Sequence, residues 1–404
     1  MANVSSSNGL EKRPKLRFPG FDEPWKETAL SSVLTERNEY AEKDGTYEHA
    51  TLSKEGIYRK TARYDRDFLV STENKKYKVT HLGDLCYNPA NLKFGVICSN
   101  TYGDAIFSPI YVTFEIEASF DPDFIGAYLT RWDFINRALK YQQGTVYERM
   151  AVSPEDFISI KCCFPQKAEQ TRLAEFITLL DKRIAAQGKY VESLKKYKRG
   201  VVRTLLSPKH CSIKNVKWTT SRIGDIGTFI KGAPLSKADI SLEGTPFILY
   251  GELYTTYNEV ISNVVRKTQA SVDKQYYSQI GDVIIPTSGE TPEEISTASC
   301  VMLPDIILAG DLNIYRCTQV DGRIMSYILN HVVNDRIARI AQGKSVVHVQ
   351  AAELSKIEIT YPDPFSQKTI IAILAAISDR IDQSNAELRL LHELRKALLQ
   401  KLFI

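Results

Sequence analysis

The chain has 404 residues, of which 43% are hydrophobic and 25% are charged, and its formal net charge is +4. This composition is typical of a folded globular protein and excludes disordered and fibrous classes. A chain of this length favours two or more domains. No apolar run reaches the ~20 residues of a transmembrane helix, and "MANVSSSNGLEKRPK" at the start lacks the apolar segment of a signal peptide. The sequence therefore predicts a cytoplasmic protein.

The cysteines give no sign of a disulfide framework or a metal site. They are scattered without CxxC spacing, and only six histidines are available to complete a zinc site. We therefore expect reduced cysteines and no metal at Cys86, Cys98, Cys162, Cys163, Cys211, Cys300 and Cys317.

The first part of the chain, residues 17–165, is predicted to be a globule of mixed α and β structure. Stretches such as "KYKVTHLGDLCYNP" and "SPIYVTFEI" are rich in Tyr, Val and Ile and are bounded by Gly, Asn and Pro, which is typical of strands and turns. "DPDFIGAYLTRWDFINRALKY" favours helix. A long amphipathic helix follows over residues 166–207.

The same order of elements is then predicted a second time. Residues 208–362 contain strand-like stretches such as "TPFILYGELYTTY" and "GDVIIPTSGE", and "GRIMSYILNHVVNDRIARIAQG" favours helix. A second long helix is expected over residues 363–404. The predicted fold class is α+β, with two mixed α/β globules that alternate with two long helices in an internal repeat.

The two long helices share one heptad pattern at a constant offset of 197 residues, which takes Lys198 to Arg395. Apolar residues recur at seam positions, and the polar interruptions match as well, Gln187 with Ser384 and Lys198 with Arg395. Such spacing over several heptads is typical of a coiled coil. The predicted seam residues are Leu173, Ile177, Leu180, Ile184, Val191, Leu194, Val201 and Leu205, and Ile370, Leu374, Ile377, Ile381, Leu388, Leu391, Leu398 and Leu402.

We expect the two helices to pair with each other as an antiparallel coiled coil with a pseudo-two-fold relation. Leu173 should then lie near Leu402, and Leu205 near Ile370, while Lys198 and Arg395 reach out of the seam along their aliphatic stems. Packing of each helix on its own globule, or dimerisation, remains an alternative.

Motifs for catalysis are absent from the sequence. "NPAN" at residues 88–91 begins like the Asn-Pro-Pro-aromatic tetrad of amino-methyltransferases but lacks its second proline and its aromatic residue. "ARIAQGKS" lacks the first glycine of a phosphate-binding loop and follows a helical pattern instead of a strand. We therefore expect no catalytic residue and no cofactor in this chain.

DNA recognition remains, because two similar globules joined by long helices suit a ligand with periodic sites. Residues 54–81 carry eight Lys/Arg against four Asp/Glu, with tyrosines between them. Such residues can contact phosphates and base edges, although a solvated surface explains them too. The candidates are Arg59, Lys60, Arg63, Lys75, Lys76, Tyr77 and Lys78 in the first globule, and Tyr250, Tyr254, Thr255, Arg266, Lys267, Gln269 and Ser288 in the second.

The chain resembles the specificity (S) subunits of type I restriction-modification enzymes. "LRFPGFDEPWKETALSSVL" is similar to their usual opening, "QKAEQTRLAEFITLLDKRI" to their central conserved helix, and "LLQKLF" to the end of the repeated copy. "WTTSRIGDIGTFIKGAPLSKADI", "PFILYGELYTTY" and "ILAGDLNIYRC" are similar to one class of their second target-recognition domain.

The resemblance implies a non-catalytic subunit that recognises a bipartite, asymmetric sequence in double-stranded DNA, one half-site per target-recognition domain. It also implies that two methyltransferase (M) subunits bring S-adenosylmethionine, and that restriction (R) subunits bring ATP and Mg chemistry. A catalytic DNA methyltransferase or nuclease, and a coiled-coil scaffold without sequence-specific binding, remain the competing functions.

Overall fold

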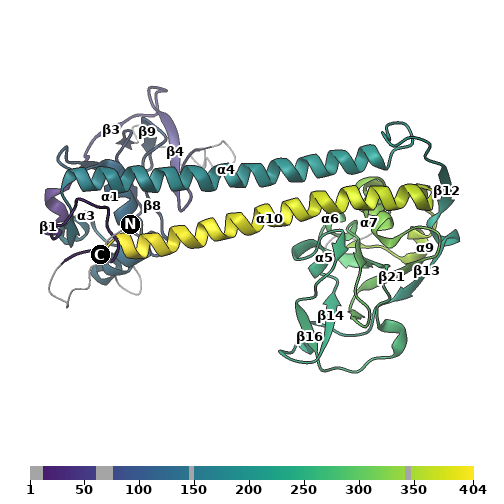
Figure 1. Ribbon diagram of the computed structural model, residues 1–404. Helices are drawn as coiled ribbons and strands as arrows, with labels where there is room; N and C mark the ends of the chain where they lie inside the picture. The colour runs from purple at the N-terminus through teal and green to yellow at the C-terminus, as the bar shows by residue number, and fades with distance from the viewer. Residues whose placement is uncertain (1–11, 61–75, 145–149, 342–346) are drawn as a thin grey trace. The chain divides into compact units, whose positions relative to one another are not determined.

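The computed structural model describes residues 12–60, 76–144, 150–341 and 347–404. The chain divides into two compact units, residues Met1–Gln187 with Leu388–Ile404, and residues Gly188–Glu387. The helices α4 (Lys167–Leu205) and α10 (Pro364–Leu402) each contribute to both units, and both are labelled in Figure 1. We describe each unit by itself, as unit 1 and unit 2.

The described residues of unit 1 form three sheets and three short α-helices besides the unit's parts of α4 and α10. The sheets have the orders β1-β11, β2-β10-β7-β8 and β3-β6-β9-β4-β5. The strands are β1 (Lys26–Ala29), β2 (Leu34–Glu36), β3 (Tyr40–Ala41), β4 (Glu48–Ser53), β5 (Gly56–Arg59), β6 (Tyr77–Thr80), β7 (Leu85–Tyr87), β8 (Ile97–Ser99), β9 (Ala105–Phe107), β10 (Val112–Ile116) and β11 (Lys161–Phe164). The short helices are α1 (Pro122–Leu129), α2 (Trp132–Ala138) and α3 (Pro154–Ser159).

The described residues of unit 2 form four sheets, with the orders β12-β23, β13-β21-β17-β19-β15, β16-β14-β20 and β18-β22. The strands are β12 (Trp218–Arg222), β13 (Gly227–Lys231), β14 (Thr245–Leu249), β15 (Val260–Ile261), β16 (Arg266–Thr268), β17 (Asp282–Pro286), β18 (Ser288–Gly289), β19 (Ser299–Val301), β20 (Ile307–Ala309), β21 (Leu312–Cys317), β22 (Val347–His348) and β23 (Glu358–Pro362). The short helices are α5 (Glu252–Thr255), α6 (Pro292–Ile295), α7 (Gly322–His331), α8 (Asn334–Ile340) and α9 (Ala351–Leu354).

The core of unit 1 is rich in aromatic residues. The rings of Tyr87, Phe114 and Phe157 stack with centroid distances of 4.7–6.0 Å, which adds to the stabilisation from area burial. Leu173 of α4 and Leu402 of α10 are buried in this same core cluster. Ends of the two helices that are far apart in the sequence are therefore packed into one core.

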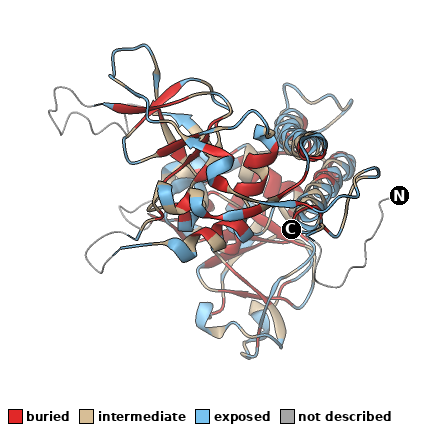
Figure 2. Cartoon of the chain, turned by 90° about the vertical axis from the view of Figure 1, so that its left-hand side faces the viewer, coloured by how far each residue is buried: buried red, intermediate tan, exposed pale blue. Residues whose placement is uncertain are grey.

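The core of unit 2 forms in the same manner but is mainly aliphatic. Leu205 of α4 and Ile370 of α10 lie in one buried cluster with Ile324 and Ile328 of α7. All the apolar seam residues predicted from the sequence are buried or half-buried, and Figure 2 shows exposed residues along the outer sides of the long helices. Burial of this stripe supplies the main driving force for packing the helices.

Some of the short helices begin at residues whose side chains accept from free backbone N–H groups. Asp121 accepts a hydrogen bond from the N–H of Phe124 at the start of α1, and Asp321 accepts one from Arg323 at the start of α7. Ser153 does the same for α3, with Pro154 in the first turn. These residue types are preferred at helix N-termini for this reason.

Candidate nucleic-acid interface

The predicted basic cluster of unit 1 divides into exposed and buried residues. Arg59, at the end of β5, has 75% of its side chain exposed and lies 3.6 Å from Glu48. Lys60 follows it, and Lys76 is exposed. Arg63 and Lys75 lie outside the described residues. The exposed members stay candidates for DNA contact.

Tyr77 and Lys78 require a correction, because both are buried in β6. Lys78 is 2% exposed, and its Nζ donates hydrogen bonds to Glu36 Oε1 at 2.8 Å and to Asn38 Oδ1 at 3.0 Å. A buried, paired ammonium cannot reach a phosphate without breaking these bonds, which is costly. Lys78 is therefore paired within the fold, and both residues are left out of the DNA-contacting set proposed below.

In unit 2, several predicted residues gather around one hollow of about 770 Å³. Tyr250, Tyr254, Thr255 and Arg266 all line it. Arg266 Nε donates to Glu252 Oε1 at 2.9 Å, and 45% of the arginine side chain is still exposed. Lys267 and Gln269 are exposed farther along β16 and after it. The structure thus brings Tyr250, which follows β14, together with residues of α5 and β16 around one hollow.

Ser288 requires the same correction as Tyr77 and Lys78. Its residue is 4% exposed, and its Oγ donates to Asp311 Oδ2 at 2.8 Å. The buried Ser288 hydroxyl therefore orients the exposed carboxylate of Asp311. The sequence pattern around Ser288 did not indicate Asp311 as its partner.

Two glutamines anchor the long helices to their units in the same manner. Gln170 of α4 accepts from the Asp121 N–H at 3.0 Å and donates to the Pro165 carbonyl at 2.9 Å. Gln367 of α10 accepts from the Asp321 N–H and donates to the Pro362 carbonyl, both at 2.8 Å. Both side chains are buried. The offset of 197 residues relates these two anchors as it relates the heptads.

A Gly-Asp turn is also repeated. Gly83 and Gly281 have φ of +91° and +96°, a backbone conformation that glycine adopts without strain. An aspartate follows each glycine and accepts a hydrogen bond from the backbone N–H three residues before it. Asp84 also pairs with Arg37, and Asp282 pairs with Arg316. These turns lead into β7 and β17, which lie beside β10 and β21 in their respective sheets.

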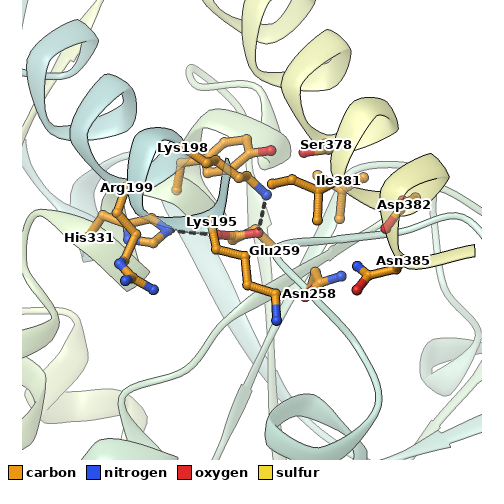
Figure 3. A pocket seen from close by; sticks show the side chains of 12 residues that line it. Lys195, Lys198, Arg199, Asn258, Glu259, His331, Ser378, Ile381, Asp382 and Asn385 are labelled. Carbon is orange, nitrogen blue, oxygen red and sulfur yellow. Dashed lines mark hydrogen bonds and ion pairs between the residues drawn. The ribbon is translucent and has the colours of Figure 1, made fainter. Parts of the chain in front are cut away.

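A pocket of about 390 Å³ in unit 2 contains an ion-pair cluster that the sequence analysis did not find (Figure 3). Glu259, before β15, lies 2.8 Å from Lys198 Nζ of α4 and 2.6 Å from His331 Nε2 of α7. Burial raises the pKa of Glu259, but the hydrogen bonds and charges of His331 and Lys198 outweigh it and bring that pKa to about 2. No motif marks residues 259 and 331 as partners.

No group of three or more His, Cys, Asp or Glu side chains in the described ranges is placed to hold a metal ion. Among the helices of those ranges, none combines the length and apolar character that crossing a membrane requires. What the geometry offers is two polar surfaces on a repeated framework.

Comparison with known proteins identifies the second half of the chain. Residues 215–392 match the family model of the type I restriction modification DNA specificity domain. Residues 215–392 therefore form a type I restriction modification DNA specificity domain. The family resemblance that the sequence motifs indicated is therefore confirmed. No curated protein sequence matches the chain.

Two solved structures share the fold over nearly their whole length. The S subunit of a type I restriction-modification system from M. genitalium is 16% identical, with a TM-score of 0.58, over 97% of this chain and 99% of that one. A chain from a structural study of complex assembly and conformational transition of the type I R-M system is 16% identical, with a TM-score of 0.59, over 95% and 98%. At this identity the likeness shows the fold, which is mixed α/β with a long C-terminal helix.

Proposed function

We propose that this chain is the DNA specificity subunit of a type I restriction-modification complex and reads a bipartite, asymmetric target, one half-site per unit. The observation that carries the proposal is a repeated framework with different polar surfaces. The glutamine anchors and Gly-Asp turns recur in both units, whereas the exposed residues on the neighbouring sheets differ. The same scaffold with two different surfaces suits two different half-sites.

The DNA-contacting set that we propose keeps only the described, exposed or half-buried candidates. In unit 1 these are Arg59, Lys60 and Lys76, and in unit 2 they are Tyr250, Tyr254, Thr255, Arg266, Lys267 and Gln269. Replacing the three basic residues of unit 1 by alanine should weaken binding to all DNA sequences and lower the salt slope by about one unit per lost phosphate contact. Arg339→Ala on α8 serves as a control from another exposed surface. An unchanged salt slope would remove that cluster from the interface.

We propose that α4 and α10 form an antiparallel coiled coil that sets the half-site separation. Within unit 1, Asp181 of α4 pairs with Arg395 of α10 at 3.0 Å, and Leu173 and Leu402 share one core. Within unit 2, Arg380 Nε donates to Tyr190 Oη at 3.3 Å, and Leu205 and Ile370 share one core. Both sets of contacts support antiparallel helices. Two methyltransferase subunits would dock on this chain and bring S-adenosylmethionine, and restriction subunits would bring ATP and Mg.

A matched insertion tests the proposed spacing. One heptad after Gln187 and one after Ser384 keeps the apolar seam in register and lengthens the helices by ~10 Å. That length is about three base pairs at ~3.4 Å each, and it rotates the second half-site by roughly 100° around the DNA axis. We expect loss of the original target and, in a target library methylated in vivo, recovery of both half-sites with a longer gap. An unchanged gap with normal activity contradicts the spacing role.

Expression of the chain together with its methyltransferase subunits tests the function as a whole. Sequencing of methylated host DNA should show one bipartite motif that disappears when this chain is omitted. The purified chain alone should transfer no label from a labelled methyl donor. Transfer by the chain alone would favour a catalytic polypeptide, and a complex with no preferred sequence would favour a scaffold.

A further inference from the structure

We propose that one turn in each unit, between β9 and β10 and between β20 and β21, carries a base-reading residue, Ile110 in unit 1 and Asp311 in unit 2. This inference rests on the proposed function and adds the residues that determine specificity. Neither residue was indicated by the basic and aromatic pattern of the sequence.

The register of the sheets β2-β10-β7-β8 and β13-β21-β17-β19-β15 places the two turns at corresponding positions, although the first turn has four residues and the second has two. Phe114 of β10 lies opposite Glu36 of β2 and Leu85 of β7. Tyr315 of β21 lies opposite Phe229 of β13 and Val283 of β17 in the same arrangement. Four residues before these two aromatics stand Ile110 and Asp311.

The strands that enter the two turns are equivalent as well. The strand β9 pairs in parallel with β4, and β20 pairs in parallel with β14. Each of these partners pairs in turn with an antiparallel strand that carries exposed basic residues, β5 with Arg59 and β16 with Arg266. Both turns therefore connect the central sheet to a sheet with candidate phosphate contacts.

Ile110 is exposed although its neighbours are packed. Its residue is 61% exposed, whereas the ring of the next residue, Tyr111, lies 5.3 Å from that of Phe107. The Tyr111 hydroxyl lies 3.3 Å from Thr51 Oγ1 of β4. The backbone of the turn is thus fixed, and it presents a β-branched apolar side chain outward.

Asp311 is also exposed on a fixed backbone. Ser288 Oγ donates to its carboxylate at 2.8 Å, the Thr287 N–H donates to its carbonyl at 2.8 Å, and Gly310 before it has φ of +75°. A carboxylate in this position keeps further acceptor sites available. Ser288 sets its orientation without covering it.

The surroundings of Asp311 contain basic as well as acidic side chains. Asp311 lines two hollows, of about 770 and about 500 Å³. Lys237 and Arg266 line the first together with Glu290 and with Glu252, the partner of Arg266, and Lys231 lines the second. Lys237 and Lys231 can contact phosphates while the Asp311 carboxylate reaches a base edge, which reduces the repulsion between this carboxylate and the DNA backbone.

The chemistry of the two side chains assigns them to different bases. A carboxylate accepts from the N4 amino group of cytosine in the major groove, and an apolar side chain contacts the methyl group of thymine. We therefore assign a cytosine to Asp311 in the half-site of unit 2 and a thymine to Ile110 in the half-site of unit 1.

Methylation motifs of the full complex test both assignments. Asp311→Asn should shift one position of one half-site from cytosine to adenine, because an amide pairs with the N6 and N7 of adenine. Ile110→Ser should relax one thymine position of the other half-site by tenfold or more. The control Asp335→Asn makes the same chemical change on α8, and Ile280→Ser does so at another exposed isoleucine, 62% exposed. Both controls should leave the motif unchanged.

The outcomes separate the inference from the function on which it rests. A wild-type complex with no defined motif would contradict the proposed function. A defined motif that stays unchanged in both variants would overturn the inference alone, as would equal changes in the controls. If Asp311→Asn abolishes methylation, Asp311→Glu distinguishes base reading from a structural role, because this variant keeps the carboxylate. Recovery of the original motif supports base reading, and continued loss assigns Asp311 a structural role and overturns the inference.

Discussion

The two units use equivalent positions of their long helices in different ways. In unit 1, Arg395 of α10 pairs with Asp181 of α4, and the two side chains are 36% and 45% exposed. At the equivalent position in unit 2, Lys198 of α4 pairs with Glu259, and those side chains are only 12% and 15% exposed. A basic residue at one repeated position thus joins helix to helix in one unit and helix to globule in the other. Repetition of a sequence pattern does not imply repetition of its contacts.

The two ion pairs should differ most in the loss of stability that follows when the acidic side chain of each pair is replaced by alanine. Glu259→Ala leaves the Lys198 ammonium buried without its carboxylate, which costs about 3–5 kcal/mol. Asp181→Ala leaves an arginine that water can solvate, so its cost is about 1 kcal/mol or less. Hydrogen-exchange mass spectrometry of the full chain reports the two units separately. Equal loss of protection in the two variants would contradict the difference in burial.

Acid should weaken the unit 2 pair in a defined pH window. The pKa of Glu259 is about 2 in the folded protein, below its ordinary value of 4.5. A lowered folded-state pKa stabilises the fold above the ordinary value, and this contribution is lost as pH falls from 4.5 to about 2. The difference corresponds to roughly 3 kcal/mol.

The Glu259→Gln variant isolates this contribution. Calorimetric unfolding of the wild type and the variant should show a difference in Tm that is present at pH 4.5 and shrinks as the pH falls toward 2. Asp181→Asn provides the matched comparison in unit 1. A Tm difference that stays constant through the acid range would show that Glu259 is not stabilised in its charged form.

Replacement of the two anchoring glutamines should destabilise the two units by similar amounts, in contrast to replacement of the acidic residues of the ion pairs. Gln170→Ala and Gln367→Ala each remove a donor and an acceptor from buried backbone partners, so we expect about 2 kcal/mol of destabilisation in each unit. Gln400→Ala in unit 1 and Gln383→Ala in unit 2 change exposed residues of α10 and should have little effect. Local hydrogen exchange at the starts of α1 and α7 measures the change. A large effect in one unit alone would mean that the two anchors are not equivalent.

The long helices were predictable because heptad spacing is a local property of the sequence. The structure has them at Lys167–Leu205 and Pro364–Leu402. The buried roles of Lys78 and Ser288 were not predictable, since each depends on a partner distant in the chain. Glu36 lies 42 residues from Lys78, and Asp311 lies 23 residues from Ser288. A basic run marks where cations are, but only tertiary contacts decide which of them stay exposed.

The pairing of Glu259 with His331 was also not predictable from the sequence, because the two residues are 72 residues apart and carry no motif. Residues that matter at a surface were also missed when their type was unexpected. Ile110 and Asp311 are neither basic nor aromatic, so a search for phosphate contacts passes over them. Their equivalence became visible only from the strand register of the two central sheets.

The smallest expected effect concerns the coupling between Asp181 and Arg395. Because both side chains are more than a third exposed, the pair should contribute about 0.2–1 kcal/mol. A double-mutant cycle with Asp181→Ala, Arg395→Ala and the double variant isolates this coupling, since the two residues touch directly. The coupling should fall further when salt is raised from 0.1 to 1 M, because screening acts on exposed charges. A coupling above 2 kcal/mol that resists salt would show that this pair is desolvated like the pair in unit 2, and the contrast between the two units would disappear.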